Sequence, residues 1–209
     1  YIYLYMYSMN SHINHQLKIW LLVLLSLIIL IILVGGLTRL TDSGLSITTW
    51  ELFVGFFPPL TNDKWIDYFN LYKTIPEYRE QNFDITLSEF KVIFWWEWAH
   101  RQLGRLIGLS VLLPLIYFTI KNGLWILKKY GIIFLLVCFQ GFLGWYMVSS
   151  GLVNRIDVSH YRLSIHLVTA FVILSIVFWN FLKLTQLNIN NISIKLYLIK
   201  FFLVLLFVQ

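Results

Sequence analysis

The chain of 209 residues is 59% hydrophobic and only 12% charged, with a mean hydropathy of +0.74. These values exclude a soluble globular domain and predict an integral membrane protein. The net charge of +6 would suit nucleic acid, but most lysines lie in short segments beside apolar runs, where membrane topology explains them, so we expect no nucleic-acid partner. The one cysteine, Cys138, lies in an apolar segment and is expected to be a small core residue.

The first apolar run, at residues 19–37, is long enough to cross a bilayer and too long for the core of a signal peptide. Residues 1–18 before it are expected to form a tail, in which residues 1–8 do not belong to the native protein. At the other end, residues 186–209 are expected to form a linker and the start of a fifth span. The sequence is therefore interpreted as a piece of a longer protein.

A polar segment at residues 38–91 follows the first run and carries eight acidic against five basic residues. Within it, Trp65, Tyr68, Phe69 and Tyr72 recur at helical spacing. They indicate an amphipathic helix that lies either in the membrane interface or on the end of a helical bundle.

Three further spans are expected after this segment. The capping-box pattern of Thr86 and Glu89 predicts the start of the next helix, which can run past Pro114 with a kink. The predicted fold is all-α: a polytopic membrane protein whose four-helix transmembrane bundle occupies residues 19–185, with short helices in the long outer loop. The four spans are expected at about residues 19–37, 94–120, 130–149 and 163–182.

The lysines that flank the apolar runs predict the orientation of the spans. If four spans alternate, these lysines fall on one side of the membrane and the acidic segment falls on the other. The amino terminus is therefore expected in the cytoplasm of a bacterium or, in the mitochondrial inner membrane, in the matrix. The lysines concerned are Lys18, Lys121, Lys128, Lys129, Lys183, Lys195 and Lys200.

Three arginines lie at the opposite ends of the spans, where topology gives no reason for positive charge. Arg101 and Arg105 are at the outer end of the second span, and Arg162 is at the outer end of the fourth. One explanation is structural, because Glu97 precedes Arg101 by four residues and can pair with it on a helix. The other is that a guanidinium fork binds carboxylates of a ligand. The sequence leaves both explanations open.

The second span begins with four ionisable side chains beside lipid, where charge is costly. On a helix, Glu97, His100, Gly104 and Gly108 lie close to one face, because they follow one another at spacings of three, four and four. A histidine with bare glycines beneath it leaves room for a flat ligand. This pattern indicates a heme ligand.

His166, at the entry of the fourth span, is the second candidate ligand. It precedes Lys183 by roughly 25 Å of helix, and His100 precedes Lys121 by about 30 Å, so the two histidines lie at similar depth. On parallel helices they can bind one porphyrin iron from opposite sides. The alternative is that each is a hydrogen-bonded structural residue.

The remaining histidines give weaker signals. His160 lies six residues before His166 on a different face, where packing at the membrane interface explains it. His12 and His15 belong to the amino-terminal tail and carry no functional signal.

A short internal repeat suggests a duplicated design. The first and third spans each lead to the tripeptide Ser-Gly-Leu, at residues 43–45 and 150–152, and then to a span that carries a histidine. The pattern predicts two helices for each histidine and one site at the outer end of the bundle.

Five ordered motifs between residues 34 and 170 resemble the heme A synthase family, in the form found in mitochondria and related bacteria. They are Gly35-Gly36-Leu37-Thr38-Arg39-Leu40-Thr41, Ser43-Gly44-Leu45-Ser46, Glu97-x-x-His100-Arg101, Gln140-Gly141-x-x-Gly144-Trp145-Tyr146-Met147-Val148-x-Ser150-Gly151-Leu152 and Tyr161-Arg162-Leu163-x-x-His166.

The resemblance implies a protein of eight spans in two similar bundles, which oxidises the C8 methyl group of heme O to the formyl group of heme A. By this resemblance the bundle seen here is the substrate side, with His100 and His166 as heme iron ligands and Glu97 as the acidic residue tied to catalysis. Heme b is expected in the missing carboxy-terminal bundle. Some relatives have a cysteine pair in the first outer loop, which this chain lacks, so no thiol role is assigned.

Glu97 also supports a mechanistic argument from its position alone. A carboxylate one turn before the iron ligand could hold or relay a proton during oxidation of the methyl group, unless Arg101 neutralises it permanently. Arg101, Arg105 and Arg162 are candidates for contact with heme propionates.

Two other classes of function compete with a heme-modifying membrane oxidoreductase. The alternative is a bis-histidine b-type membrane cytochrome that passes electrons and does no chemistry on its heme. A small transporter or assembly scaffold without stoichiometric heme is a third class. For the synthase, the expected partners are heme O, the lipid bilayer, heme O synthase and assembly factors of the terminal oxidase; the sequence does not predict an oligomeric state.

Overall fold

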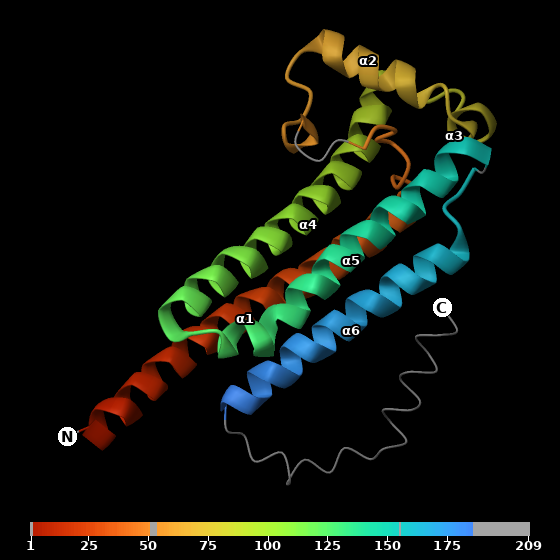
Figure 1. Cartoon of the computed structure of the whole chain (residues 1–209). Coiled ribbons are helices and arrows are strands. Elements are labelled where there is room, and N and C mark those ends of the chain that lie inside the picture. The colour runs from red at the N-terminus through yellow and green to blue at the C-terminus, as the bar shows by residue number, and fades with distance from the viewer. Residues whose placement is uncertain (1, 51–53, 155, 186–209) are drawn as a thin grey trace.

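The computed structural model describes residues 2–50, 54–154 and 156–185, and every regular element in them is helical. Four long helices run side by side, and shorter helices cover one end of them (Figure 1). The long helices are α1 (Ile2–Leu40), α4 (Leu87–Asn122), α5 (Trp125–Asn154) and α6 (His160–Thr185). The short ones are the 3-10 helix Val54–Phe56, α2 (Asn62–Tyr72) and α3 (Pro76–Glu80).

The four long helices are each long and apolar enough to cross a membrane, over His12–Leu40 in α1, all of α4, Trp125–Leu152 in α5 and all of α6. Their outward faces expose large apolar side chains such as Leu33, Leu113 and Leu135, each about 60% exposed. Such faces are stable against lipid and not against water. The chain is therefore a multi-pass, all-helical membrane protein, as the composition predicts. The expected fifth span lies outside the described residues.

The long helices alternate in direction and form a square. Helix α1 packs against α4 and α6, and α5 packs against the same two helices. Helices α4 and α6 therefore lie on one diagonal and run in the same direction. This arrangement is the up-down-up-down bundle, and it brings the two histidine-bearing helices to face each other across its centre.

Away from α2, apolar side chains at helical spacing hold the bundle together. Leu17, Leu21, Leu24 and Ile28 of α1 are at most 4% exposed, and they share one core with residues of the other three long helices. A polar contact adds to this core, because Trp20 donates from Nε1 to the backbone oxygen of Ser110 in α4 at 2.8 Å. The members contributed by α4 are Ile107, Val111, Leu115 and Phe118.

A second, aromatic core lies beneath α2, at the end of the bundle that the short helices cover. Trp65, Phe69 and Tyr72 are the buried face of α2. The ring of Trp65 meets that of Phe94 in α4 with 4.9 Å between centroids, and Phe69 meets Phe90 at 5.0 Å. Of the two interpretations of this aromatic stripe, packing on the end of the bundle is the one the structure shows.

Helix α4 begins and continues as its sequence predicts. Thr86 and Glu89 form the complete capping box, with each side chain bound to the backbone of the other residue. Pro114 lies inside the helix, which continues to Asn122. The long α4 therefore carries His100 and its neighbours on one unbroken element.

The prediction for Cys138 is wrong, because this side chain is exposed on α5. On a membrane-spanning helix the outward face is as apolar as the inward one, so an apolar neighbourhood in the sequence does not imply burial. Cys138 lies on the face that lipid would cover.

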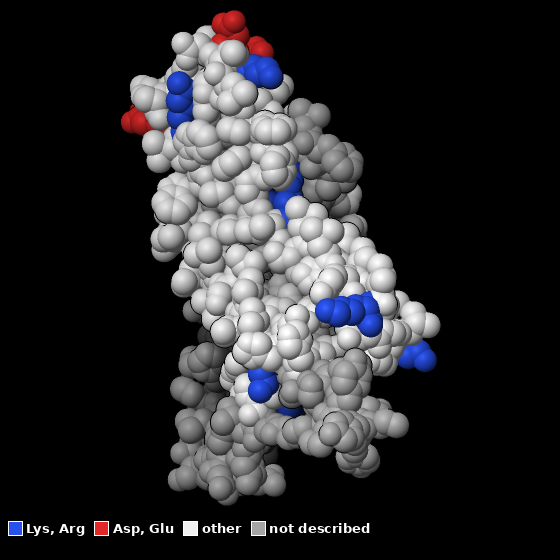
Figure 2. Space-filling model, turned by 90° about the vertical axis from the view of Figure 1, so that its left-hand side faces the viewer, with Lys and Arg blue, Asp and Glu red and all other residues white. Residues whose placement is uncertain are grey.

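Charged side chains gather at the two ends of the bundle. Lys121, Lys128 and Lys129 lie at the turn between α4 and α5, and Lys183 lies near the end of α6. On the face drawn in Figure 2, the acidic side chains gather at the opposite end, where α2 lies. Two further lysines used to predict orientation, Lys195 and Lys200, lie outside the described residues.

Candidate functional site

The imidazole of His100 lies against the backbone of α1. A Cβ atom added to Gly35 would be only 2.9 Å from Cε1 of His100 and 3.4 Å from its Nδ1. Only glycine allows so close an approach of backbone to a ring. The glycine that receives His100 is thus on the neighbouring helix and not on α4 itself.

His166 repeats this arrangement on the other diagonal helix. A Cβ atom added to Gly144 of α5 would be 3.3 Å from Cε1 of His166. The two imidazoles are close enough to interact electrostatically. The predicted pair is therefore brought together, each ring seated on a glycine of the preceding membrane-spanning helix.

Both rings have an unsatisfied nitrogen. Nδ1 of His100 and Nδ1 of His166 are buried, and neither has a hydrogen-bond partner among the residues described. An unpaired buried polar atom costs about 1–3 kcal/mol, so it is uncommon without a function. Two half-buried imidazoles on parallel helices fit axial ligation of a heme iron through Nε2, which leaves Nδ1 of each ring for a hydrogen-bond partner.

The glycines on the face of His100 differ in the space around them. A Cβ atom at Gly104 would make ordinary contact, 3.8 Å from Cδ1 of Ile31, whereas one at Gly108 would meet nothing within 4 Å. The open space expected beside this face is therefore found at Gly108 and not at Gly104.

The carboxylate of Glu97 is buried, and both of its oxygens accept hydrogen bonds. It is 4% exposed and accepts hydrogen bonds from Oγ of Ser46 and the backbone nitrogen of Ile47, both at 2.7 Å. Its other oxygen accepts from Arg101 at 2.5 Å. The carboxylate therefore ties the segment after α1 to α4, and a sequence could predict only the contact with Arg101.

The turn that ends α1 brings the following residues, Ser46 and Ile47, into contact with Glu97. Asp42 has a φ of 47°, the left-handed conformation that closes many helices, and Ser43 donates from its backbone nitrogen to the oxygen of Thr38 at 2.9 Å. Arg39 binds both Asp42 and Asp157, each at 3.3 Å, which links this turn to the connection between α5 and α6.

Arg101 is held by protein groups on several sides. Besides Glu97, it donates to the backbone oxygens of Ile47 at 2.9 Å and Thr49 at 3.1 Å, and its guanidinium lies over the ring of Trp50. The structural explanation of Arg101, pairing with Glu97, is therefore present in the structure.

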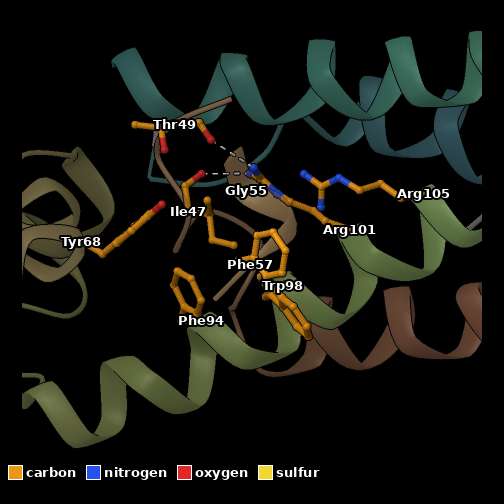
Figure 3. Close-up of a pocket in the computed structure, with 9 residues that line it drawn as sticks. All are labelled: Ile47, Thr49, Gly55, Phe57, Tyr68, Phe94, Trp98, Arg101 and Arg105. Atoms are coloured by element: carbon orange, nitrogen blue, oxygen red, sulfur yellow. Dashed lines mark hydrogen bonds between the residues drawn. The ribbon is translucent and has the colours of Figure 1, made fainter. Parts of the chain in front are cut away.

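Arg101 and Arg105 line one small pocket between α4 and the segment after α1 (Figure 3). Both side chains extend from α4 toward the same side of the pocket, while Trp98 and Phe57 form an aromatic wall. Nε1 of Trp98 is buried and has no acceptor in the described part of the chain. Two positive charges and an indole donor in one pocket are suited to an anion.

Arg162 lies apart from this pocket. It donates to the backbone oxygen of Tyr146 at 2.6 Å, and its guanidinium lies 3.6 Å from the centre of the Tyr146 ring. His160, the first residue of α6, is exposed.

Two polar residues of the site region were missed by sequence reasoning. Glu77 of α3 is 3% exposed and accepts from the hydroxyl of Tyr72 at 3.3 Å; its burial, and then the charge of Glu97, raise its pKa to about 8. Gln140 of α5 donates to the backbone oxygen of His166 at 2.9 Å. Gln140 lies in a motif of the resemblance, but only the helix pairing reveals its contact.

Comparison with known proteins identifies relatives of the chain. A family model described as cytochrome oxidase assembly protein matches residues 18–209. A heme A synthase of Pelagibacter ubique is 57% identical over 174 residues, which are 82% of this chain and 52% of the relative. A heme A synthase of Rhodopseudomonas palustris is 47% identical over 86% of this chain and 50% of the relative, and one of Flavobacterium psychrophilum is 49% identical over 79% and 50%.

The chain spans about half the length of the curated relatives it matches. No solved structure matches it.

Proposed function

The chain belongs to the cytochrome oxidase assembly protein family, and we propose that it forms the substrate-binding part of a heme A synthase. The reaction would convert the C8 methyl group of heme O to the formyl group of heme A. The curated relatives, which carry the name heme A synthase, support this activity.

One observation carries the proposal: His100 and His166 lie on diagonal, parallel helices, and each ring is seated on a glycine of the preceding membrane-spanning helix. The glycine under each ring removes the side chain that would push the imidazole away. Rings held in this way are pre-oriented, so little conformational freedom is lost when they bind iron. We assign His100 and His166 as the axial ligands of the heme O iron.

The pocket beside α4 supports a site for propionate. Arg101 and Arg105 both line this pocket, whereas Arg162 is engaged with Tyr146 outside it, so we place a propionate beside the two pocket arginines, with the indole N–H of Trp98 as a further donor. Arg101 adds positive charge to the pocket and forms part of its wall. A charge-assisted bond from guanidinium to carboxylate is roughly twice as strong as a neutral one.

Glu97 has two candidate roles, as a proton relay or as a clamp. All three of its contacts donate to the carboxylate, and Arg101 compensates its charge. These contacts favour the clamp, in which Glu97 fixes the segment that forms the wall of the Arg101 pocket. The relay requires the carboxylate to leave at least one of these partners during the reaction.

The wider assignment follows the family. Since the relatives are about twice as long, we propose a second bundle that binds heme b, a multi-pass location in the bacterial cytoplasmic membrane or mitochondrial inner membrane, and an amino terminus in the cytoplasm or matrix. Heme O synthase and assembly factors of the terminal oxidase are the proposed partners. We keep residues 19–185 as the bundle and residues 38–91 as its outer loop.

Pigment extraction tests this function against the competing cytochrome. Heme O and heme A in the purified protein are expected for the synthase, and heme b alone would indicate an electron-transfer protein. Replacing His100 or His166 by Ala should abolish the bis-imidazole spectrum of bound heme O. An unchanged spectrum in either variant would remove that residue as a ligand.

A further inference from the structure

The side-chain amide of Gln140 uses its nitrogen in a hydrogen bond, whereas its oxygen has no donor among the described residues. Its Nε2 donates to the backbone oxygen of His166 at 2.9 Å. Only the nitrogen end of the amide can face a carbonyl oxygen, so this bond fixes which way the side chain points. Oε1 is then presented as an acceptor; it is buried, and nothing in the described part of the chain donates to it.

The position of this oxygen relates it to the heme site. Gln140 precedes Gly144 by one helical turn, and Gly144 is the seat of the His166 ring. An unpaired acceptor inside a membrane-spanning bundle is costly, because no lipid group can satisfy it. A ligand that brings a donor to this place would recover that cost.

The chemistry of the proposed substrate limits which donor this can be. The methyl and vinyl groups of a heme do not donate, and ionised propionates only accept, so they suit Arg105 and not an amide oxygen. Heme O carries one hydroxyl, on the farnesyl-bearing side chain that replaces a vinyl group of heme b. We propose that Oε1 of Gln140 accepts a hydrogen bond from this hydroxyl and so makes Gln140 a specificity residue for heme O over heme b.

This inference rests on the proposed function and adds a residue that discriminates between substrates. A site built to hydrogen-bond a hydroxyl disfavours the analogue that lacks it, because the polar group of the site then stays unpaired. The apolar farnesyl chain also favours heme O, but through contact with lipid and apolar side chains. The two contributions can be separated, since only the first depends on Gln140.

The test is a titration of the 209-residue chain in lipid nanodiscs with heme O and, separately, with heme b, followed by the Soret absorbance. Gln140→Met keeps the length of the side chain and removes its acceptor. We expect the affinity for heme O to fall about tenfold while the affinity for heme b changes less than about twofold. Gln140→Asn, which withdraws the acceptor but stays polar, should give the same selective loss.

Phe139→Leu is the matched control, because Phe139 lies on the same turn but is 48% exposed. Its heme O and heme b affinities should both match those of the unaltered chain. Equal losses for the two hemes in the Gln140 variants would overturn the inference and leave Gln140 as a residue that only positions α6. Unchanged affinities would overturn it as well.

Failure of the proposed function gives a different result. If the unaltered chain shows no bis-imidazole spectrum with either heme, the ligand assignment falls and this inference falls with it. If the unaltered chain binds both hemes and the Gln140 variants keep the ratio of affinities, only the specificity role is lost.

Discussion

His100 of α4 lies so close to Gly35 of α1 that a Cβ atom at position 35 would be 2.9 Å from Cε1 of the ring. Such a distance is shorter than normal van der Waals contact, so the ring would have to move if position 35 carried a side chain. The pair therefore couples the backbone of one helix to the orientation of a candidate iron ligand on another.

Gly35→Ala should displace the His100 ring and weaken heme binding. Overpacking of this kind typically costs about 1–3 kcal/mol, and the displaced ring should lose about tenfold or more in affinity for heme O. The measurement is a heme titration together with the spectrum of the bound state. Normal affinity with an unchanged bis-imidazole spectrum would contradict the coupling.

Gly36→Ala is the control for this substitution. Gly36 is the next residue in the same helix, and a Cβ atom there meets nothing within 4 Å. Because alanine has the higher helix propensity, the control should bind heme normally and be no less stable. The same logic applies to Gly144→Ala, with a milder expected effect at 3.3 Å, and to Gly141→Ala as its control.

Glu97→Gln keeps the volume of the side chain and removes its charge. We expect heme to stay bound while conversion of heme O stops in the full-length protein, because Arg101 loses its charged partner and the wall of its pocket loosens. Loss of a charge-assisted bond should also cost about 1.5–3 kcal/mol of stability. Pigment analysis after expression with heme O measures the conversion.

The control for Glu97 is Glu80→Gln, since Glu80 is an exposed carboxylate of the outer loop. It should produce heme A at the normal rate. Normal production by Glu97→Gln would exclude both the clamp and the relay.

Gly151→Ala tests the contact between the two Ser-Gly-Leu segments. A Cβ atom at Gly151 would be 2.7 Å from Cδ2 of Leu45, which is buried in the aromatic core beneath α2. We expect a loss of about 1–3 kcal/mol in stability, measured by thermal unfolding in detergent. Shortening the neighbour in the double variant Gly151→Ala with Leu45→Val should recover part of the loss, and additive losses would contradict a direct contact.

The elements of the fold could be predicted because each depends on local sequence. Four apolar runs of sufficient length give the four spans, and Thr86 with Glu89 gives the start of α4. The Glu97–Arg101 pair is also local, since residues four apart meet on any helix. The roles of the site residues in binding and catalysis stay predictions until heme is bound.

The contacts between helices could not be predicted, because they depend on how each helix is rotated about its axis. Hydropathy gives little information about rotation when all faces are apolar, which is why the sequence predicts a core position for Cys138 although its side chain is exposed. For the same reason the glycines expected to make room for His100 were those of α4, whereas Gly35 of α1 receives the ring. The Ser-Gly-Leu repeat was visible, but the contact of Leu45 with Gly151 was not.

Glu77 gives the outer loop a pH dependence. Burial, and then the charge of Glu97, raise the pKa of Glu77 from 4.5 to about 8 in the folded chain, with smaller contributions of the same sign from Asp42 and Asp157. Its neighbour Tyr72 stays a neutral donor, because burial and the charge of Glu77 raise the pKa of the Tyr72 hydroxyl. Folded α3 therefore holds a proton between pH 4.5 and 8 that the opened loop releases.

The sign of the effect follows from this difference in bound protons. The folded form binds more protons than the open form in this window, so the stability of α3 should fall as pH rises from 4.5 to 8, by up to about 1.4 kcal/mol per pH unit, and level off above 8. Glu77→Gln cannot ionise, so it should match the unaltered chain only below pH 4.5, exceed it in stability at pH 8 and show no slope between. The measurement is hydrogen-exchange protection of the α3 amides, corrected for intrinsic exchange at each pH, with Glu80→Gln as the control that keeps the slope. A slope that persists in Glu77→Gln would assign the titration to another group.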